Sequence, residues 1–170
     1  MELRPVKDWF LRIAIFAAII IALMLINIRQ LANEASDAPS QNALVTMRSS
    51  DGNPLTISAE VASTTEQLTK GLMNRTRLEQ NEGMLFVFPY VATEAFWMKN
   101  TLIPLDMIFI NESSTIIKIH HAVPCAADPC PLYNSEKPVK YVLEINGNLA
   151  STYNIEEGSK VEITIFNPTS

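Results

Sequence analysis

The stretch Glu94–Ile110, EAFWMKNTLIPLDMIFI, decides how this chain is expected to fold. Two runs of strand-forming residues flank the short connection Thr101–Pro104, and this pattern predicts a β-hairpin. In an antiparallel hairpin with this connection, Lys99 faces Asp106 across the two strands. Strand alternation places Trp97 on the same face as Lys99. The stretch therefore predicts a charged pair beside an indole ring, inside an otherwise apolar block.

The N-terminal end of the 170-residue chain is strongly apolar. No polar side chain occurs from Ile13 to Ile26, and flanking residues extend this run to 9–28, about the 20 residues that a membrane-crossing helix needs. A cleaved signal peptide is the alternative, because basic residues precede the apolar run. No small-x-small cleavage site follows closely, so we expect an uncleaved transmembrane anchor over 9–28, with 1–8 in the cytoplasm.

Basic residues set the expected orientation of the chain. Three of them precede the apolar run, whereas Arg29 alone follows it closely, and such an excess favours a cytoplasmic N-terminus. We therefore expect a single-pass protein of the inner (cytoplasmic) membrane whose C-terminal domain is periplasmic or extracellular. Residues 29–42 are polar without apolar periodicity and predict a flexible linker. The exported globular domain is expected over 43–170.

The expected domain reads as short strands with two small helices. Besides the hairpin, strands are predicted at 44–48, 55–62, 84–88, 115–121, 141–145 and 161–166. A capping box at Thr64–Gln67 starts a helix that runs to about Met73, and Leu149–Tyr153 predicts a second short helix. We expect an α+β fold, mainly antiparallel β, with a small rolled sheet or barrel and two short helices, preceded by one transmembrane helix.

Charge and cysteine content exclude several classes of function. The net charge of −5 does not favour electrostatic binding of nucleic acid. Cys125 and Cys130 are close in sequence, and in an exported domain they favour a disulfide. A zinc site is the alternative, but these two thiols with His120 or His121 leave one ligand missing. We expect a disulfide, no bound metal and no cofactor.

Motifs spread over the expected domain carry a resemblance to a known family. They are Gly71-Leu72-Met73 with Arg75, Gly83-Met84-Leu85-Phe86, Phe96 to Thr101, Pro104-Leu105-Asp106, Tyr133 with Ser135, and Tyr141 to Glu144. These motifs are similar to those of the domain of unknown function 192 family, prokaryotic proteins of which many carry an N-terminal signal or anchor. The family has no agreed biochemical activity, so the resemblance implies no reaction.

Polar and aromatic residues in and around the predicted hairpin form a candidate ligand site. They are Arg75, Trp97, Lys99, Asn100, Asp106, Tyr133, Ser135 and Glu144. An aromatic ring beside charges and an amide is a common way to hold a sugar or another small polar ligand. Two alternatives stay open: Lys99 and Asp106 as a structural ion pair, or Asp106 and Glu144 as a general acid and base.

These observations favour a binding protein and leave an enzyme as the third, less favoured hypothesis. We expect a membrane-anchored, exported domain that binds a small polar or carbohydrate-like ligand. The alternative is an accessory protein of the cell envelope that binds a protein partner, with the motif residues purely structural. The expected partners are the membrane, through the N-terminal helix, and either a small polar ligand or an envelope protein; nucleic acid is not expected.

Overall fold

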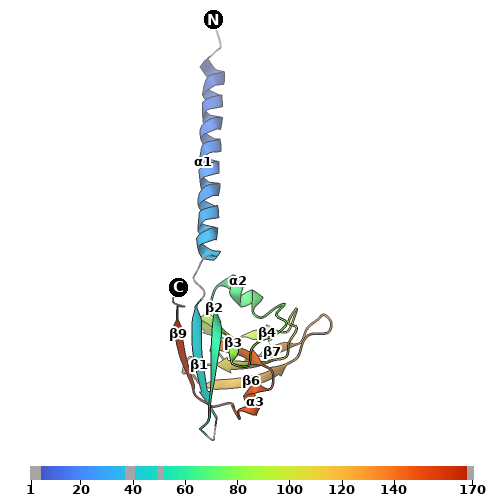
Figure 1. Cartoon of the computed structure of the whole chain (residues 1–170). Helices are drawn as coiled ribbons and strands as arrows, with labels where there is room; N and C mark the ends of the chain where they lie inside the picture. Colours follow the sequence, from blue (N-terminus) through green and yellow to red (C-terminus); the bar gives the residue numbers. More distant parts are fainter. Residues whose placement is uncertain (1–4, 37–40, 50–51, 168–170) are drawn as a thin grey trace. The chain divides into compact units, whose positions relative to one another are not determined.

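The structure of the protein, a computed structural model, describes residues 5–36, 41–49 and 52–167. The chain divides into two compact units, 1–39 and 40–170. The helix α1, Pro5–Ser36, lies in the first unit. Nine strands and the short helices α2 and α3 lie in the described part of the second unit (Figure 1). The candidate site belongs entirely to the second unit.

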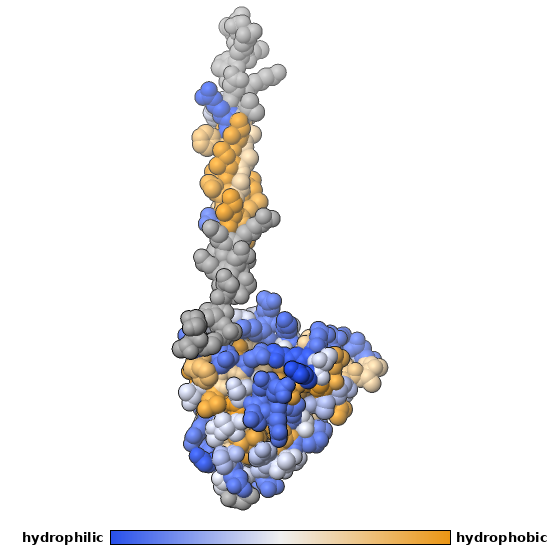
Figure 2. Space-filling model, viewed as in Figure 1, coloured by the Kyte–Doolittle hydropathy of each residue, from blue (hydrophilic) through white to orange (hydrophobic). Residues whose placement is uncertain are grey.

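The helix α1 exposes apolar side chains, among them Trp9 and Phe16, and hydrophobic residues cover much of its surface in Figure 2. Among the described residues, however, no helix is long and apolar enough to cross a membrane. A crossing needs about 20 consecutive apolar residues, and the uninterrupted apolar run Ile13–Ile26 is shorter than this. The finding contradicts the transmembrane helix predicted over 9–28.

The second unit is built on one seven-stranded sheet with the strand order β6-β5-β8-β3-β2-β1-β9. The bounds of its strands are β1 Asn42–Arg48, β2 Pro54–Ala62, β3 Glu82–Ala92, β5 Leu105–Ile110, β6 Ile116–Ala122, β8 Val139–Asn146 and β9 Val161–Phe166. Neighbouring strands are antiparallel except β2 and β3, which are parallel. The expected mainly antiparallel, β-rich domain is confirmed.

The sheet is open, so the predicted small barrel is wrong. Its edge strands β6 and β9 approach each other at one end, where Thr115 and Lys160 form an isolated antiparallel bridge. The amide of Val161 also donates to the carbonyl of Ser114 at 2.9 Å. Two further backbone hydrogen bonds join Ile116 of β6 to the turn before β9: its amide donates to Ser159 at 3.0 Å, and its carbonyl accepts from Gly158 at 2.7 Å. Among the described residues, the strands β6 and β9 themselves are not paired.

Local signals in the sequence place the first hairpin and the first short helix correctly. The strands β1 and β2 pair around a turn, and Ser49 accepts a hydrogen bond from Gly52 at 3.0 Å. The helix α2, Thr65–Lys70, begins at the predicted capping box: the amide of Gln67 donates to the Thr64 hydroxyl, and the amide of Thr64 donates to Gln67 Oε1. The hairpin and the start of the helix are confirmed, but the helix ends at Lys70 rather than near Met73, because Gly71 takes a positive φ of +46°.

The predicted central hairpin is wrong. The strand β4, Ala95–Trp97, pairs with β7, Leu132–Asn134, in a separate two-stranded sheet. The chain leaves the strand after Trp97, because the amide of Thr101 donates to the carbonyl of Met98 and Asn100 adopts a left-handed φ of +57°. The strand β5 then enters the main sheet between β6 and β8. Consequently Lys99 and Asp106 are not cross-strand partners.

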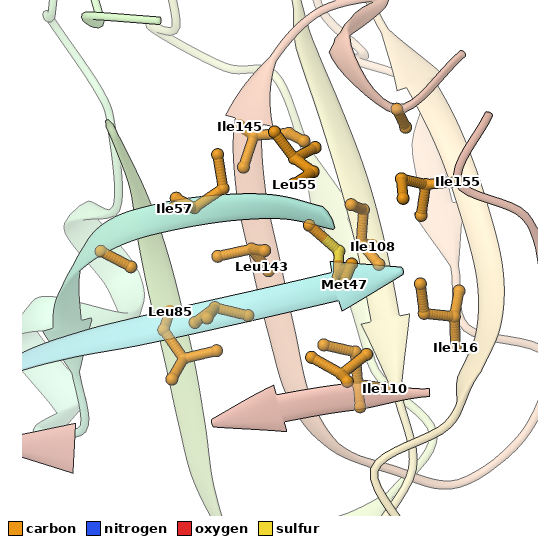
Figure 3. Close-up of a cluster of buried hydrophobic side chains, with 14 of the residues drawn as sticks. Met47, Leu55, Ile57, Leu85, Ile108, Ile110, Ile116, Leu143, Ile145 and Ile155 are labelled. Atoms are coloured by element: carbon orange, nitrogen blue, oxygen red, sulfur yellow. The ribbon is translucent and has the colours of Figure 1, made fainter. Parts of the chain in front are cut away.

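Buried side chains form two clusters on opposite faces of the strands β5 and β8. Figure 3 shows the first cluster, in which Ile108 of β5 and Leu143 of β8 pack with side chains of β1, β2 and β3. The second cluster contains Met107 of β5 and Val142 of β8, and α2, β4 and the segment 71–73 border it. Side chains alternate between the clusters because successive strand residues point to opposite faces. Every residue of β5 is buried as a result.

Gly83 lies where β3 passes closest to β8, and we expect Gly83→Ala to be strongly destabilising. A Cβ atom there would lie 2.6 Å from the backbone oxygen of Glu144 and 3.0 Å from Cγ2 of Ile57. Because the nearest atom is backbone, the strands must move apart, and the free energy of unfolding should fall by about 3 kcal/mol. Urea unfolding followed by tryptophan fluorescence measures the change.

Gly158→Ala is the matched control for this substitution. Gly158 has a positive φ of +95°, but no atom lies within 4 Å of the added Cβ, so only backbone strain opposes the change. We expect a loss of about 1 kcal/mol. Equal losses for the two variants would show that β3 and β8 separate without cost at Gly83.

Candidate functional site

Glu144 is a carboxyl group buried in the apolar face of the main sheet. It lies in the middle of β8, with Met84 of β3 and Met107 of β5 as its cross-strand neighbours. Only 5% of the residue is exposed. Burial raises the pKa of Glu144 from its usual 4.5 to about 8. Within the described residues no hydrogen bond or ion pair to this carboxyl group is found. No fully buried side-chain oxygen in this part of the chain lacks a hydrogen-bond partner, so the carboxyl oxygens of Glu144 are open to the adjoining space rather than sealed in the sheet.

The carboxyl group of Glu144 borders a hollow of about 130 Å³ beneath the helix α2. The lining residues are Leu68, Thr69, Lys70, Gly71, Leu72, Met73, Phe86, Phe96, Trp97, Thr101 and Glu144. A Cβ atom on Gly71 would lie 3.1 Å from the ring of Phe86 and 4.0 Å from Oε2 of Glu144. We call this space the Glu144 hollow. Because Gly71 has no side chain, nothing from this residue fills the space between Phe86 and the Glu144 carboxyl group.

Aromatic rings form one side of the Glu144 hollow. Phe86 and Phe96 pack edge to face, with ring centroids 4.9 Å apart. Phe96 packs in the same way on Phe109, at 5.8 Å. Trp97 lies at the surface with 47% of the residue exposed. The hollow thus combines a buried carboxyl group with two fixed rings and one accessible ring.

A larger hollow of about 340 Å³ adjoins the Glu144 hollow. Its lining residues are Gln41, Asn42, Glu60, Val61, Ala62, Gln67, Lys70, Gly71, Arg75 and Met84. Lys70 and Gly71 line both hollows, so these two residues form the boundary between them. The predicted site residue Arg75 belongs to the larger hollow. Its guanidinium group binds the carboxylate of Glu60 through two hydrogen bonds, one of them 2.7 Å between Nη1 and Oε1.

Lys99 lies against the ring of Trp97. Its ammonium nitrogen is 5.7 Å from the centroid of the indole ring and 2.9 Å from Oδ2 of Asp128. Asp128 belongs to the short loop that the disulfide between Cys125 and Cys130 closes. The predicted disulfide is confirmed, and its loop supplies the ionic partner of Lys99.

Asp106 lies on the opposite face of the sheet from Glu144. Its carboxylate accepts hydrogen bonds from the amides of Asn148 at 2.9 Å and Ala150 at 2.8 Å. Nδ1 of His121 lies 2.9 Å from the same carboxylate. Asp106 therefore caps the helix α3, Leu149–Thr152, whose own N-cap residue makes no side-chain cap. Asp106 and Glu144 do not share a cleft, as an acid and base pair would require.

The other predicted site residues lie outside the Glu144 hollow and have structural contacts. The carbonyl of Asn100 accepts a hydrogen bond from the amide of Asn74 at 2.8 Å. The ring of Tyr133 packs on His120, with centroids 5.6 Å apart. The buried hydroxyl of Ser135 donates to the carbonyl of Lys137. The described residues contain no cluster of His, Cys, Asp and Glu that could hold a metal ion.

Of the predicted site residues, the structure brings Trp97 and Glu144 to one hollow. The sequence prediction missed Lys70, Gly71, Phe86 and Thr101, which border the same space. Phe86 read as an ordinary core residue of an apolar strand, and nothing in its spacing indicated otherwise. Gly71 was the one residue that the sequence could have marked, because a glycine directly after a helix indicates a C-cap with positive φ. In the structure the φ of Gly71 is +46°.

The chain was compared with known proteins on the basis of its sequence and its fold. The model of the DUF192 family, described as Uncharacterized ACR, matches residues 46–163. The chain belongs to the DUF192 family. The resemblance seen in the sequence motifs is confirmed, and the match lies within the second unit. The comparison with curated proteins finds no match.

Two solved structures are similar to this DUF192 protein. One is a protein of Sinorhizobium meliloti 1021 described as a candidate transcription regulator; it is 34% identical, with a TM-score of 0.67, over 73% of this chain and 94% of that one. The other is a protein of unknown function from Novosphingobium aromaticivorans DSM 12444, 37% identical with a TM-score of 0.67, over 74% of this chain and 88% of that one. Neither description names a ligand.

Proposed function

We propose that this DUF192 protein binds a small polar, carbohydrate-like ligand in the Glu144 hollow. The observation that carries the proposal is a carboxyl group, 5% exposed and without a partner, that borders a hollow beside an accessible tryptophan. A carboxyl group with so little exposure is poorly hydrated, and its charged form costs stability unless a partner binds it. A ligand would supply the missing hydrogen bonds, while its apolar face stacks on Trp97.

The dimensions of the hollows support a ligand that occupies both. Binding sites for small molecules usually have volumes of about 300 to 1,000 Å³. The Glu144 hollow alone is smaller than this range, at about 130 Å³, but the adjoining hollow adds about 340 Å³. A ligand anchored at Glu144 would extend past Gly71 toward the side-chain amides of the larger hollow, which suit hydroxyl groups.

We also propose that the second unit acts in an oxidising compartment outside the cytoplasm. The support is the disulfide between Cys125 and Cys130, because such bonds persist in exported proteins and are rare in the cytosol. The net charge of −5 does not favour DNA binding, so the description of the Sinorhizobium protein as a transcription regulator is not carried over.

Docking of an envelope protein is a second candidate function, favoured by exposed apolar side chains on the small sheet. Trp97 of β4 and Leu132 of β7 are cross-strand neighbours, and they are 47% and 60% exposed. A partner that used this surface would bury both side chains together. Leu132→Ser should then abolish capture of the partner, whereas it should leave binding of a small ligand intact.

Thermal melting and calorimetric titration of the full chain against mono- and disaccharides, polyols and small amides test the proposal. A ligand at a hundred times its dissociation constant should add about 2.7 kcal/mol to the free energy of unfolding. We expect Trp97→Ala to weaken that ligand about tenfold through loss of ring stacking. The substitution itself should change the melting temperature little, because Trp97 is exposed.

Tyr90→Ala is the matched control, since Tyr90 is also aromatic, is 80% exposed and does not line the hollow. It should leave the affinity unchanged. Equal weakening by both substitutions would place the ligand elsewhere on the surface. If no compound of the panel stabilises the wild type, small-ligand binding is rejected in favour of the docking function.

A further inference from the structure

We propose that the ligand of the Glu144 hollow is an amino sugar, whose ammonium group pairs with the Glu144 carboxylate while its hydroxyl groups face the larger hollow. This inference rests on the proposed function and names the ligand class of the same site. The juxtaposition behind it is an unpartnered carboxyl group and three aromatic side chains, Phe86, Phe96 and Trp97, around one small space.

The lining of the Glu144 hollow suits a cation. A carboxylate is the natural counter-ion of an ammonium group, and a charge-assisted hydrogen bond is roughly twice as strong as a neutral one. A neutral hydroxyl group would satisfy the hydrogen bonds of Glu144 but would not form an ion pair. The neighbours Met84 and Met107 on the adjoining strands offer no competing hydrogen bond donor.

The two hollows together set the space that the ligand can fill. The Glu144 hollow, of about 130 Å³, is below the usual size of a small-molecule site, and the adjoining hollow adds about 340 Å³. With its ammonium group at Glu144, the sugar can therefore lie beside Trp97 while its far hydroxyl groups pass Gly71 into the larger hollow. Asn42 lines that hollow, as do Gln41, whose Nε2 donates to Asn167, and Gln67, whose Oε1 accepts from the amides of Ser63 and Thr64.

The nearby lysines define where the ammonium group can lie. Lys70 is the other charged residue that lines the Glu144 hollow, and it does so at the boundary with the larger hollow. Lys99 lies against the ring of Trp97 and is paired with Asp128. Burial is the cause that raises the pKa of Glu144. Because Lys70 would repel a second cation, the ammonium group of the ligand lies at Glu144 and its uncharged hydroxyl groups lie near Lys70.

Isothermal titration calorimetry of the full chain with glucosamine and glucose at pH 6.5 tests the inference. The two sugars differ only in an ammonium group against a hydroxyl group at one carbon. We expect glucosamine to bind at least tenfold more tightly. Because Glu144 is protonated before binding and ionised in the complex, about one proton should be released per glucosamine bound. Titrations in two buffers with different ionisation enthalpies measure that proton.

Glu144→Gln keeps the shape of the protonated side chain and cannot ionise. It should bind both sugars equally and release no proton, and its melting curve shows whether it is folded. Glu66→Gln is the control for a general loss of negative charge, because Glu66 of α2 is exposed and lines neither hollow. This variant should keep the preference for glucosamine and the proton release.

The possible outcomes separate this inference from the proposed function. Equal binding of glucose and glucosamine by the wild type would overturn the ammonium assignment and leave the small-ligand function standing. Tight binding of glucosamine without proton release would overturn the ion pair with Glu144. Binding of neither sugar overturns the amino sugar assignment, and the wider panel of compounds then decides the proposed function on its own.

Discussion

Asp106→Ala is expected to lower the free energy of unfolding by about 3 to 5 kcal/mol. The carboxylate is buried and accepts hydrogen bonds from the amides of Asn148 and Ala150. It also holds Nδ1 of His121 at 2.9 Å. Removing the carboxylate leaves the buried amide of Ala150 unpaired and takes away the cap of α3. Urea unfolding at pH 7 measures the loss.

Two further variants identify which contact of Asp106 matters. His121→Ala should cost less than about 1 kcal/mol, because His121 is exposed and its pairing with a carboxylate lies near solvent. Asp106→Asn keeps one oxygen acceptor and should fall between the other two variants. If His121→Ala costs as much as Asp106→Ala, the histidine rather than the start of α3 is the partner that stabilises the fold.

The sequence predicted those elements whose signals are local. The capping box at Thr64 needs only residues within one helical turn, and the turn between β1 and β2 lies within a few residues. The strand β9 appears with its predicted bounds, Val161–Phe166, because its polar and apolar residues alternate. Each of these signals depends on interactions between residues that are close in the chain, so a single sequence is enough to predict these elements.

Strand pairing across long separations could not be predicted from the same signals. The strand β5 is buried at every residue, so its sequence has no alternation to show which face meets which partner. A tight turn at Thr101–Pro104 would have given a hairpin, but β4 instead pairs with β7, more than 30 residues later in the chain. Packing of Phe96 on Phe86 and Phe109 favours that arrangement, and such contacts exist only in the folded protein.

The candidate site was predictable to the extent that polar residues in apolar runs reveal it. Glu144 interrupts the apolar strand β8, and the sequence analysis included it among the polar residues expected to converge near Trp97. Asp106 interrupts an apolar strand in the same way, yet it caps a helix on the other face. Composition alone cannot distinguish the roles of these two carboxyl groups. They differ because the backbone amides of Asn148 and Ala150, far along the chain, donate hydrogen bonds to Asp106 and not to Glu144.

Raising the pH from 5 to 8 is expected to destabilise the wild type by about 3 to 5 kcal/mol relative to Glu144→Gln. Folded Glu144 keeps its proton up to a pKa of about 8, whereas the unfolded chain loses it near 4.5. Unfolding therefore releases a proton between these two pH values, and the stability of the wild type falls as the pH rises. Below the lower value and above the upper one the difference between the two proteins should be constant.

Urea unfolding of both proteins at pH 5, 6.5 and 8 measures this difference, and other titrating groups cancel because the proteins share them. Parallel pH profiles would mean that Glu144 is solvated or paired in the folded state. The expected divergence has a consequence for function. Domains have only about 5 to 15 kcal/mol of stability, and a glutamine at this position would avoid the loss at neutral pH. A carboxyl group kept at such a cost is better explained by a ligand that binds it than by the packing of the sheet.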